Sequence, residues 1–260
     1  ERIINVSNEL ANQNNTGEVE KVDYRILVHV IADQATLATI NLNYLQLNKL
    51  YKLLPTSVSK ATLKDLQTNL KTGSLNNLQI KINGKPQNFP FKNESGSFSL
   101  NGELRNTNYN FMPKWLGLTN LNGNLAIKNQ NLTLKLNSGN LDQLRLSNTT
   151  MSINDISQNH LTMTANIQIN GSHEDYLDYF RQSPYEPQIT TLEDQLTKIT
   201  GNAQTNIKLS SSLDNPQRLK LSGSYNIENS QLTLKSPALE LSEIQGKLNF
   251  SQNGIETSRI

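Results

Sequence analysis

The three histidines of this sequence, His29, His160 and His173, are the residues best suited to metal binding or proton transfer. They lie far apart in the chain, without the short spacings at which two imidazoles bind one zinc ion. His173 and Glu174 resemble the start of a zinc-protease helix, but Leu177 stands where the second imidazole would be needed. The histidines therefore predict no metal site.

Carboxylates gather at Glu174, Asp175 and Asp178. A carboxylate pair can hydrolyse a glycosidic bond only across a suitable cleft, which this pattern does not indicate. Directly after Ser172, the same residues are typical of a helix N-terminus, where the backbone dipole favours negative charge. Trp115, the single tryptophan, is expected to be a packing residue rather than a sugar platform.

Other catalytic patterns are missing from the sequence. It has no cysteine, and it has neither a phosphate-binding glycine loop nor a nucleophile elbow. We therefore predict that the chain is not an enzyme and binds no cofactor. A carbohydrate-active enzyme would require a carboxylate pair in a polar cleft. The absence of cysteine is compatible with any compartment, including an oxidising bacterial periplasm.

The dominant pattern is alternation of apolar and polar residues, and it is most regular from Leu121 to Ile169. Successive side chains of a strand point to opposite faces, so the pattern predicts a sheet with one apolar and one polar face. Short apolar bursts separated by Asn, Gly and Ser are typical of an antiparallel meander. We expect the apolar face to be lined by Leu121, Leu125, Ile127, Leu132, Leu134, Leu136, Leu144, Leu146, Met151, Ile153, Leu161, Met163, Ile167, Ile169, Ile207, Leu209, Leu219, Leu221, Tyr225, Ile227, Leu232 and Leu234.

Alternation alone fits two structures. One is a β-sandwich or adhesin-like scaffold in which a second sheet covers the apolar face. The other is a sheet curved into an open apolar groove that holds lipid tails. By alternation alone the sandwich is the better fit, because a bare apolar sheet is normally covered. The expected lining is almost purely aliphatic, with few of the large aromatic residues that usually fill a sandwich core, and this narrows the difference between the two structures.

Composition limits the remaining possibilities. The 260 residues suffice for a sizeable core, and a formal net charge of +2 does not indicate nucleic-acid binding. No stretch approaches the apolar length that spans a bilayer. The chain begins at Glu1 without an initiator methionine or signal pattern, so we expect it to be a piece of a longer protein.

Helical spacing interrupts the alternation in two regions. Apolar residues from Ile40 to Leu54 follow each other at intervals of four and three, which predicts a helix over 40–54, and a second helix is predicted over 59–70. Ser172 with Asp175 resembles a capping box that opens a helix over 173–182. A short helix is predicted over 191–199.

These elements predict four parts. Residues 1–20 form an irregular segment, and 21–171 form a first β-groove module with a helical insert at 40–70. Residues 172–200 form a helical connector, and 201–260 form a second β-groove module. The segments NGNLAIKNQNLTLK (122–135) and SGSYNIENSQLTLK (222–235) align without gaps, which suggests repeated sheet modules.

Several segments resemble one protein family. The run from Ser95 to Gly139 contains a Tyr-rich strand, a Pro113-Lys114-Trp115 segment and a Leu-Asn-Gly strand start at Leu121. The stretch 47–82 and the segment DYLDYFRQSPYEP add a helix, a Leu-Pro step and a Ser-Pro connector. Over 24–260 the chain resembles the AsmA-like superfamily, and within it the YhdP-type proteins of Gram-negative envelopes, although Leu116 replaces the proline expected after the tryptophan.

This resemblance implies an antiparallel repeat sheet curved into an open apolar groove, with phospholipid as the partner. Such proteins are anchored in the inner membrane and extend across the periplasm. They are implicated in moving phospholipid to the outer membrane and in maintaining its permeability barrier. The resemblance implies contact with the membrane through parts outside this chain, and no nucleic-acid partner.

Overall fold

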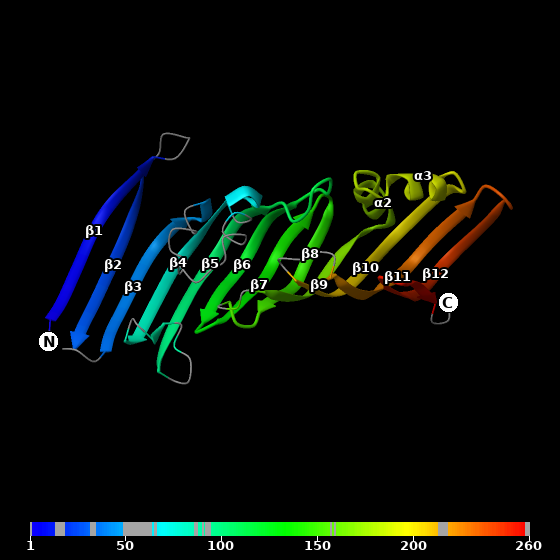
Figure 1. The fold of residues 1–260 in the computed structure, drawn as a ribbon. Coiled ribbons are helices and arrows are strands. Elements are labelled where there is room, and N and C mark those ends of the chain that lie inside the picture. The colour runs from blue at the N-terminus through cyan, green and yellow to red at the C-terminus, as the bar shows by residue number, and fades with distance from the viewer. Residues whose placement is uncertain are drawn as a thin grey trace. The chain divides into compact units, whose positions relative to one another are not determined.

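The described part of the chain is a single antiparallel sheet with a few short helical segments. The computed structural model describes residues 2–13, 19–31, 35–48, 64, 67–85, 88, 89, 91, 95–156, 158, 160–212 and 218–257. Its 13 described strands are hydrogen-bonded in chain order, each to the strand before and after it (Figure 1). The fold is therefore mainly β, as the alternation predicted.

The elements have the following bounds: β1 (Arg2–Gln13), β2 (Val19–Ile31), β3 (Ala35–Gln46), β4 (Leu70–Gly84), β5 (Gly96–Tyr109), β6 (Leu118–Lys128), β7 (Asn131–Leu141), β8 (Leu144–Ile153), β9 (Thr162–Ser172), α2 (His173–Arg181), α3 (Glu186–Glu193), β10 (Leu196–Ser212), β11 (Lys220–Leu234), β12 (Leu239–Ser251) and β13 (Gly254–Thr257).

The chain divides into two compact units. The first comprises Glu1–Thr107, Asn122–Leu134 and Ser152–Leu161, and the second comprises Asn108–Leu121, Lys135–Met151 and Thr162–Ile260. The first unit buries Leu75, Leu78, Ile80, Phe98, Leu100 and Leu104 along β4 and β5. The second unit buries Leu141, Leu144, Leu146, Ile169 and Ala203 together with Tyr176 and Tyr179 of α2.

The predicted helix over 40–54 is wrong where the structure describes it, because residues 35–46 form β3. Residues 49–54 lie outside the described part. The helical interpretation left out two apolar residues, Ala38 and Leu42, which alternate with Ile40. In the register with β4, Ala38, Ile40 and Leu42 stand opposite Ile82, Ile80 and Leu78. This cross-strand apolar pairing stabilises the strand over an isolated amphipathic helix.

Three other boundaries differ from the predictions. The segment 1–20, expected to be irregular, contains β1 paired with β2. The predicted helix over 59–70 lies mostly outside the described residues, although 67–69 are helical and β4 begins at Leu70. The helix predicted over 191–199 is replaced by α3, which begins at Glu186 and carries proline in its first turn, where a missing N–H is tolerated.

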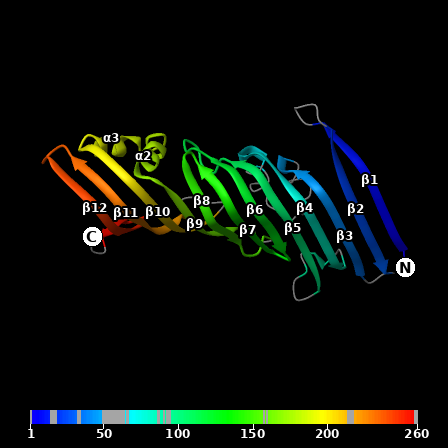
Figure 2. The ribbon, with the colours of Figure 1, turned by 180° about the vertical axis from the view of Figure 1, so that it is seen from behind.

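The capping box at the start of α2 is confirmed. The Asp175 N–H donates to Ser172 Oγ (3.1 Å), and the Ser172 N–H donates to Asp175 Oδ2 (2.8 Å). Both backbone donors are thereby satisfied, which fixes where the helix begins after β9. Two views from opposite sides show α2 and α3 beside the ends of β10 and β11 (Figure 1 and Figure 2).

Irregular positions inside the strands keep the apolar residues on one face. In five described strands, an asparagine with positive φ makes the step between two inward residues three instead of two. Leu75 and Leu78 in β4 are both buried, as are Leu104 and Thr107 in β5, although an odd step would normally place them on opposite faces. These asparagines are Asn77, Asn106, Asn120, Asn148 and Asn229, and Glu243 in β12 also has positive φ.

Three of these irregular positions share one hydrogen-bonding arrangement. In each, the asparagine precedes a serine or threonine that is 2% exposed: Thr107, Thr149 and Ser230. Each hydroxyl donates to the carbonyl oxygen two residues earlier, at 3.2, 3.0 and 3.2 Å respectively. The buried hydroxyls are therefore satisfied within their own strand, so they can occupy an apolar face at little cost.

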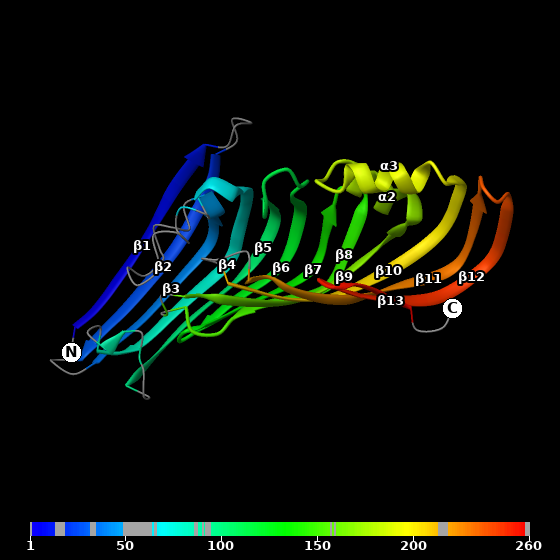
Figure 3. The same ribbon diagram turned by 45° about the vertical axis from the view of Figure 1, so that its right-hand side comes forward.

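Bulges in neighbouring strands of the second unit lie at nearly the same level. The registers shift between Thr200 and Asn202 in β10 and on both sides of Ser230 in β11. Gly201 has φ +112°, and a Cβ there would overlap Ser230 Oγ, so the close approach requires glycine. Bulges bend a strand and increase its twist. Strands β10, β11 and β12 accordingly curve along their length (Figure 3).

The two aligned segments of the sequence adopt different structures. Residues 122–135 form the end of β6, a turn at Asn129 and the start of β7, whereas residues 222–235 lie almost entirely within β11. Asn129 and Asn229 both have positive φ, 52° and 46°. Asn129 therefore lies in a turn that reverses the chain, whereas Asn229 lies in a bulge inside a continuous strand. The two aligned segments are not a structural repeat.

Candidate functional site: an apolar sheet face

The apolar face is best defined in the second unit, where the registers are known. Ile167 of β9 stands opposite Ile207 of β10, which stands opposite Gly223 of β11, and Gly223 stands opposite Phe250 of β12. Phe250 pairs in turn with Ile255 of β13. Alternation thus produces a row without charged residues that crosses five strands on one face.

Neighbouring rows on this face have the same character. Ala165, Leu209 and Leu221 form one row, and Ile169, Thr205 and Tyr225 form another with Leu248. None of the residues in these rows is charged. Lys208, Lys220 and Lys247 lie on the opposite phase of the same strands. Electrostatic attraction therefore cannot select a ligand on this face, and hydrocarbon is the chemistry that it fits.

Helix α2 covers part of the face. Tyr176 and Tyr179 pack against Leu144, Ile169 and Ala203, which are only 1, 6 and 4% exposed. The Tyr176 hydroxyl donates to the Ile169 carbonyl oxygen (3.0 Å), and the Thr205 hydroxyl donates to Tyr176 Oη (2.9 Å). Burial raises the pKa of Tyr176, so its hydroxyl keeps its proton. The helix therefore combines apolar packing with specific hydrogen bonds.

His173 connects the start of α2 to β11. Its Nδ1 lies 2.6 Å from Tyr225 Oη and its Nε2 lies 2.6 Å from Ser230 Oγ. The ring is 4% exposed, and this burial lowers its pKa because it disfavours the charged form. Desolvation likewise raises the pKa of Tyr225 above its ordinary range. The site is therefore a neutral hydrogen-bonded contact, with both ring nitrogens occupied.

An aromatic cluster holds the other side of α2. Trp115 packs against Tyr179, Phe180 and Tyr185, with ring centroids 5.8, 6.2 and 5.8 Å apart. Phe111 approaches the indole from the β5–β6 connection, at 6.3 Å. As expected from the sequence, Trp115 is a packing residue, because its surroundings are aromatic side chains of its own unit.

The residues expected to line the face differ in accessibility. Leu219 is exposed at 37%. A first group is buried: Leu121, Ile127, Leu136, Leu144, Leu146, Leu161 and Ile169. A second group is half-buried: Leu125, Leu132, Leu134, Met151, Ile153, Met163, Ile167, Ile207, Leu209, Leu221, Tyr225, Ile227, Leu232 and Leu234. The half-buried group is the part of the prediction that remains within reach of a ligand.

Sequence reasoning missed several residues of this face. Leu248, Phe250 and Ile255 belong to it through their pairings in β11–β13. The alternation of Gly246, Leu248 and Phe250 was the available signal. The contacts of His173 with Tyr225 and Ser230 had no such signal, because 52 and 57 residues separate the partners.

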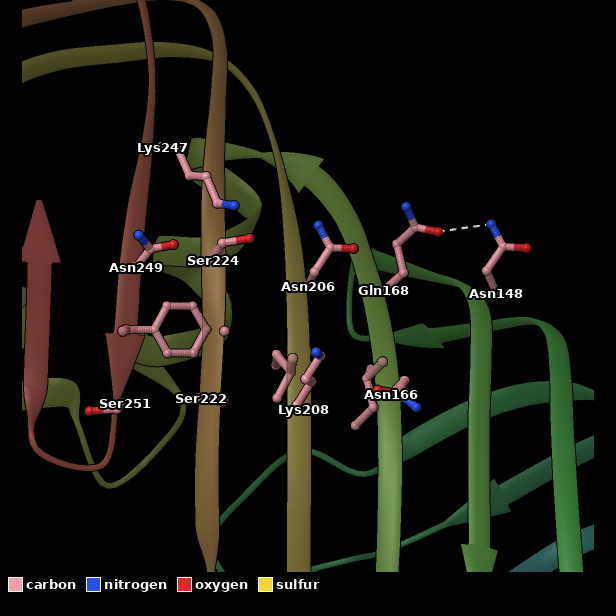
Figure 4. Close-up of a pocket in the computed structure, with 14 residues that line it drawn as sticks. Asn148, Asn166, Gln168, Asn206, Lys208, Ser222, Ser224, Lys247, Asn249 and Ser251 are labelled. Atoms are coloured by element: carbon pink, nitrogen blue, oxygen red, sulfur yellow. Dashed lines mark hydrogen bonds between the residues drawn. The ribbon is translucent and has the colours of Figure 1, made fainter. Parts of the chain in front are cut away.

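A shallow, mainly polar hollow adjoins the row that crosses β9–β13. It measures about 720 Å³, and ten of its 14 lining residues are Asn, Gln, Ser or Lys of β8–β12 (Figure 4). The other four are Ile167, Ile207, Gly223 and Phe250 of the apolar row. Asn148 Nδ2 donates to Gln168 Oε1 (2.9 Å) across it. No buried side-chain nitrogen or oxygen in the described ranges lacks a hydrogen-bond partner. The hollow therefore offers no buried unpaired group with which to select a ligand.

The first unit has a comparable hollow of about 840 Å³. Polar and charged side chains of β3–β5 line it, including Lys71, Glu103 and Arg105. Arg105 is already paired with Glu103 at 2.6 Å, and both side chains are solvent-exposed. Exposed pairs of this kind contribute little energy.

The carboxylates near α2 act structurally. Asp175 caps the helix, Asp178 pairs with Arg181, and Arg181 also binds Glu193 (2.5 Å). Within the described ranges, no three His, Asp or Glu side chains are grouped so as to hold a metal ion. Among these residues there is likewise no helix with the length and apolar character required to cross a membrane.

Comparisons with known proteins agree with this geometry. The family model described as YhdP protein matches residues 33–260. A relative from Escherichia coli (strain K12), named intermembrane phospholipid transporter YhdP, is 28% identical over 188 residues. The match covers 72% of this chain and 14% of the relative, so the chain spans a small part of that protein's length. No solved structure matches the chain. The chain belongs to the YhdP family.

Proposed function

We propose that the apolar face of this sheet shields phospholipid acyl chains from water while phospholipid moves between the two membranes of the cell envelope. The observation that carries the proposal is the set of uncharged, mainly apolar rows that together extend over β9–β13. The name of the relative, an intermembrane phospholipid transporter, supplies the cargo class.

The physical basis is the solvation of hydrocarbon. An acyl chain that leaves a bilayer exposes methylene groups to water, each at a cost of about 0.8 kcal/mol. Aliphatic side chains along the face remove part of that exposure without directional bonds, so a chain can slide without meeting a deep binding well. The headgroup remains in water beside the face. An apolar face of this kind gives no direction to transport. The net direction of phospholipid movement must therefore be set by something other than this face.

We place this activity in the periplasm, with the intact protein anchored in the inner membrane by parts outside this chain. In that setting the face supports the permeability barrier of the outer membrane by helping to supply its phospholipid. The family assignment and the relative's name support this placement.

The alternative was a scaffold with a closed sandwich core. In the described part of the chain all strands belong to one sheet, so no second described sheet covers the apolar rows. The half-buried state of Leu209, Leu221 and Phe250 also favours the open face over the sandwich.

A matched pair of substitutions tests the proposal. Leu221 lies on the apolar face, and Ser222 lies beside it on the polar face. A carboxylate at position 221 can keep part of its hydration, so Leu221→Asp should reduce the free energy of unfolding by only about 1–2 kcal/mol. We expect Leu221→Asp to remain folded by circular dichroism and to lose phospholipid from native mass spectra. Ser222→Asp should retain it.

Two outcomes contradict the proposal. One is equal phospholipid binding by both variants and the unsubstituted chain. The other is complete unfolding of Leu221→Asp while Ser222→Asp stays folded, which would indicate a sealed core around position 221.

A further inference from the structure

We infer that α2 is a fixed wall on the apolar face, which confines acyl chains to the uncovered strip beside it. This inference rests on the proposed function and adds where on the face the lipid lies. The covered area is the floor under Tyr176 and Tyr179, formed by Leu144, Leu146, Ile169 and Ala203. The strip contains Met163, Leu209, Leu221, Phe250 and Ile255.

The registers separate the strip from the covered area. Along β10, Ala203 lies under the helix, Ile207 packs at the edge of the covered cluster, and Leu209 lies beyond it. Leu209 stands opposite Leu221, which continues the strip into β11. Covered residues are buried, whereas Leu209 and Leu221 are half-buried and Ile255 is 71% exposed.

The polar contacts of α2 distinguish a wall from a movable lid. His173 binds Tyr225 and Ser230, each at 2.6 Å, and Tyr176 binds Thr205 and the Ile169 carbonyl oxygen. Thr205 and Ser230 are 5 and 2% exposed. An acyl chain has no donor or acceptor, so hydrocarbon replacing the helix would leave these buried partners without their bonds to α2. Lifting the helix is therefore opposed by the chemistry of the cargo itself.

The strip is suited to hydrocarbon by its lack of charge. No Lys, Arg, Asp or Glu lies on the apolar phase of β9, of β10 from Ala203 to Ser211, or of β11 from Leu221 to Ile227. The lysines of these strands project from the other face. Acyl chains of phospholipid are thus the occupant to which this surface is complementary, and a charged polypeptide is not.

Photolabelling maps the lipid track directly. The unsubstituted protein would be loaded from vesicles of phosphatidylcholine that carries a diazirine near the end of one acyl chain, then irradiated and analysed by peptide mass spectrometry. We expect adducts at Leu209, Leu221 and Phe250, at least tenfold above those at Leu144, Ile169 and Ala203. Comparable labelling of the covered residues would show that α2 lifts, which overturns the wall while the proposed function stands.

Two further results are decisive. Absence of adducts from the whole apolar face, or adducts confined to the polar face, would refute the proposed function and the wall with it. His173→Ala removes the contacts to Tyr225 and Ser230, and we expect it to raise labelling of Ala203 and Ile169 at least fivefold. The control Glu174→Ala changes an exposed residue of the same helix and should match the unsubstituted protein. Unchanged labelling in a folded His173→Ala would show that these contacts do not hold the wall.

Discussion

His173 shows how one buried residue defines the contact between α2 and the sheet. Ser230 donates its hydroxyl hydrogen to the Glu228 carbonyl oxygen (3.2 Å), so its oxygen is free to accept from His173 Nε2–H. His173 Nδ1 then accepts from the Tyr225 hydroxyl. This assignment follows from the network and uses one neutral tautomer. A protonated ring would carry a second N–H, and the Tyr225 hydroxyl would have to turn away.

The pH dependence of stability follows from this residue. Burial lowers the folded-state pKa of His173 below its ordinary value of 6.5, so the unfolded chain takes up the proton first as the pH falls. Stability should be independent of this group above about pH 6.5 and decrease below it, by at most about 1.4 kcal/mol per pH unit. Urea denaturation at several pH values between 5 and 7.5 measures the effect.

A substitution at the same position provides the control. His173→Gln cannot titrate, so its stability should lose most of the dependence between pH 5 and 6.5. An equal slope in both proteins would show that another group is responsible.

At the residue scale, local signals were predictable and distant ones were not. Ser172 and Asp175 identified the start of α2, because a capping box uses residues three positions apart. The contacts of His173 depend on where α2 folds back onto β11. No spacing in the sequence contains that information.

At the scale of single strands, bulges decide which face each side chain occupies. Ile227 and Leu232 are separated by an odd number of positions, yet the bulge at Asn229 leaves both on the apolar phase of β11. The sequence signal is a step of three between inward residues with asparagine before the second. Asparagine suits this position because it adopts positive φ more readily than most residues.

Replacement of Asn229 by valine tests this role. A β-branched residue at φ 46° is strained, so Asn229→Val should lower the free energy of unfolding by roughly 1–3 kcal/mol. Gln231→Val places the same side chain two residues later, at an exposed strand position with no positive φ. It should change stability by no more than about 0.5 kcal/mol. Chemical denaturation compares the two, and equal losses would contradict a conformational requirement at Asn229.

Strand β3 shows why element type was harder to predict than face. The positions from Ile40 to Leu47 fit a helical stripe and an alternating strand at once. Pairing with both β2 and β4 stabilises the strand over the helix. A short stretch of sequence does not reveal such pairing partners. From Leu121 to Ile169 the apolar residues alternate without also following a helical spacing, so the strands there were predicted correctly.

At the scale of the whole molecule, the second unit separates its lysines from its apolar rows, because they lie on opposite faces of β10–β12. The net charge is only +2, and lysines 208, 220 and 247 project from the polar face. Binding driven by the apolar face should therefore be insensitive to screening, whereas binding driven by these lysines should weaken as the Debye length shrinks.

Salt dependence of lipid binding separates the two faces. We expect phospholipid retention, measured by native mass spectrometry after equilibration at about 0.1 M and about 1 M salt, to change less than twofold, although the Debye length falls from about 10 to about 3 Å. Lys208→Gln and Lys247→Gln should likewise have little effect. A tenfold loss of lipid at high salt would place the main contact on the polar hollow.

The order of the strands in the sheet also determines how the chain can fold. Each described strand pairs with those next to it in the chain, so most pairings close short loops, and short loops lose little conformational entropy on closure. A hairpin can form as soon as its second strand is available, and the next strand then adds to the finished edge. A sandwich would have to wait for distant strands. This sheet can instead assemble progressively from one end as the polypeptide emerges, which limits the time its apolar residues spend unpaired.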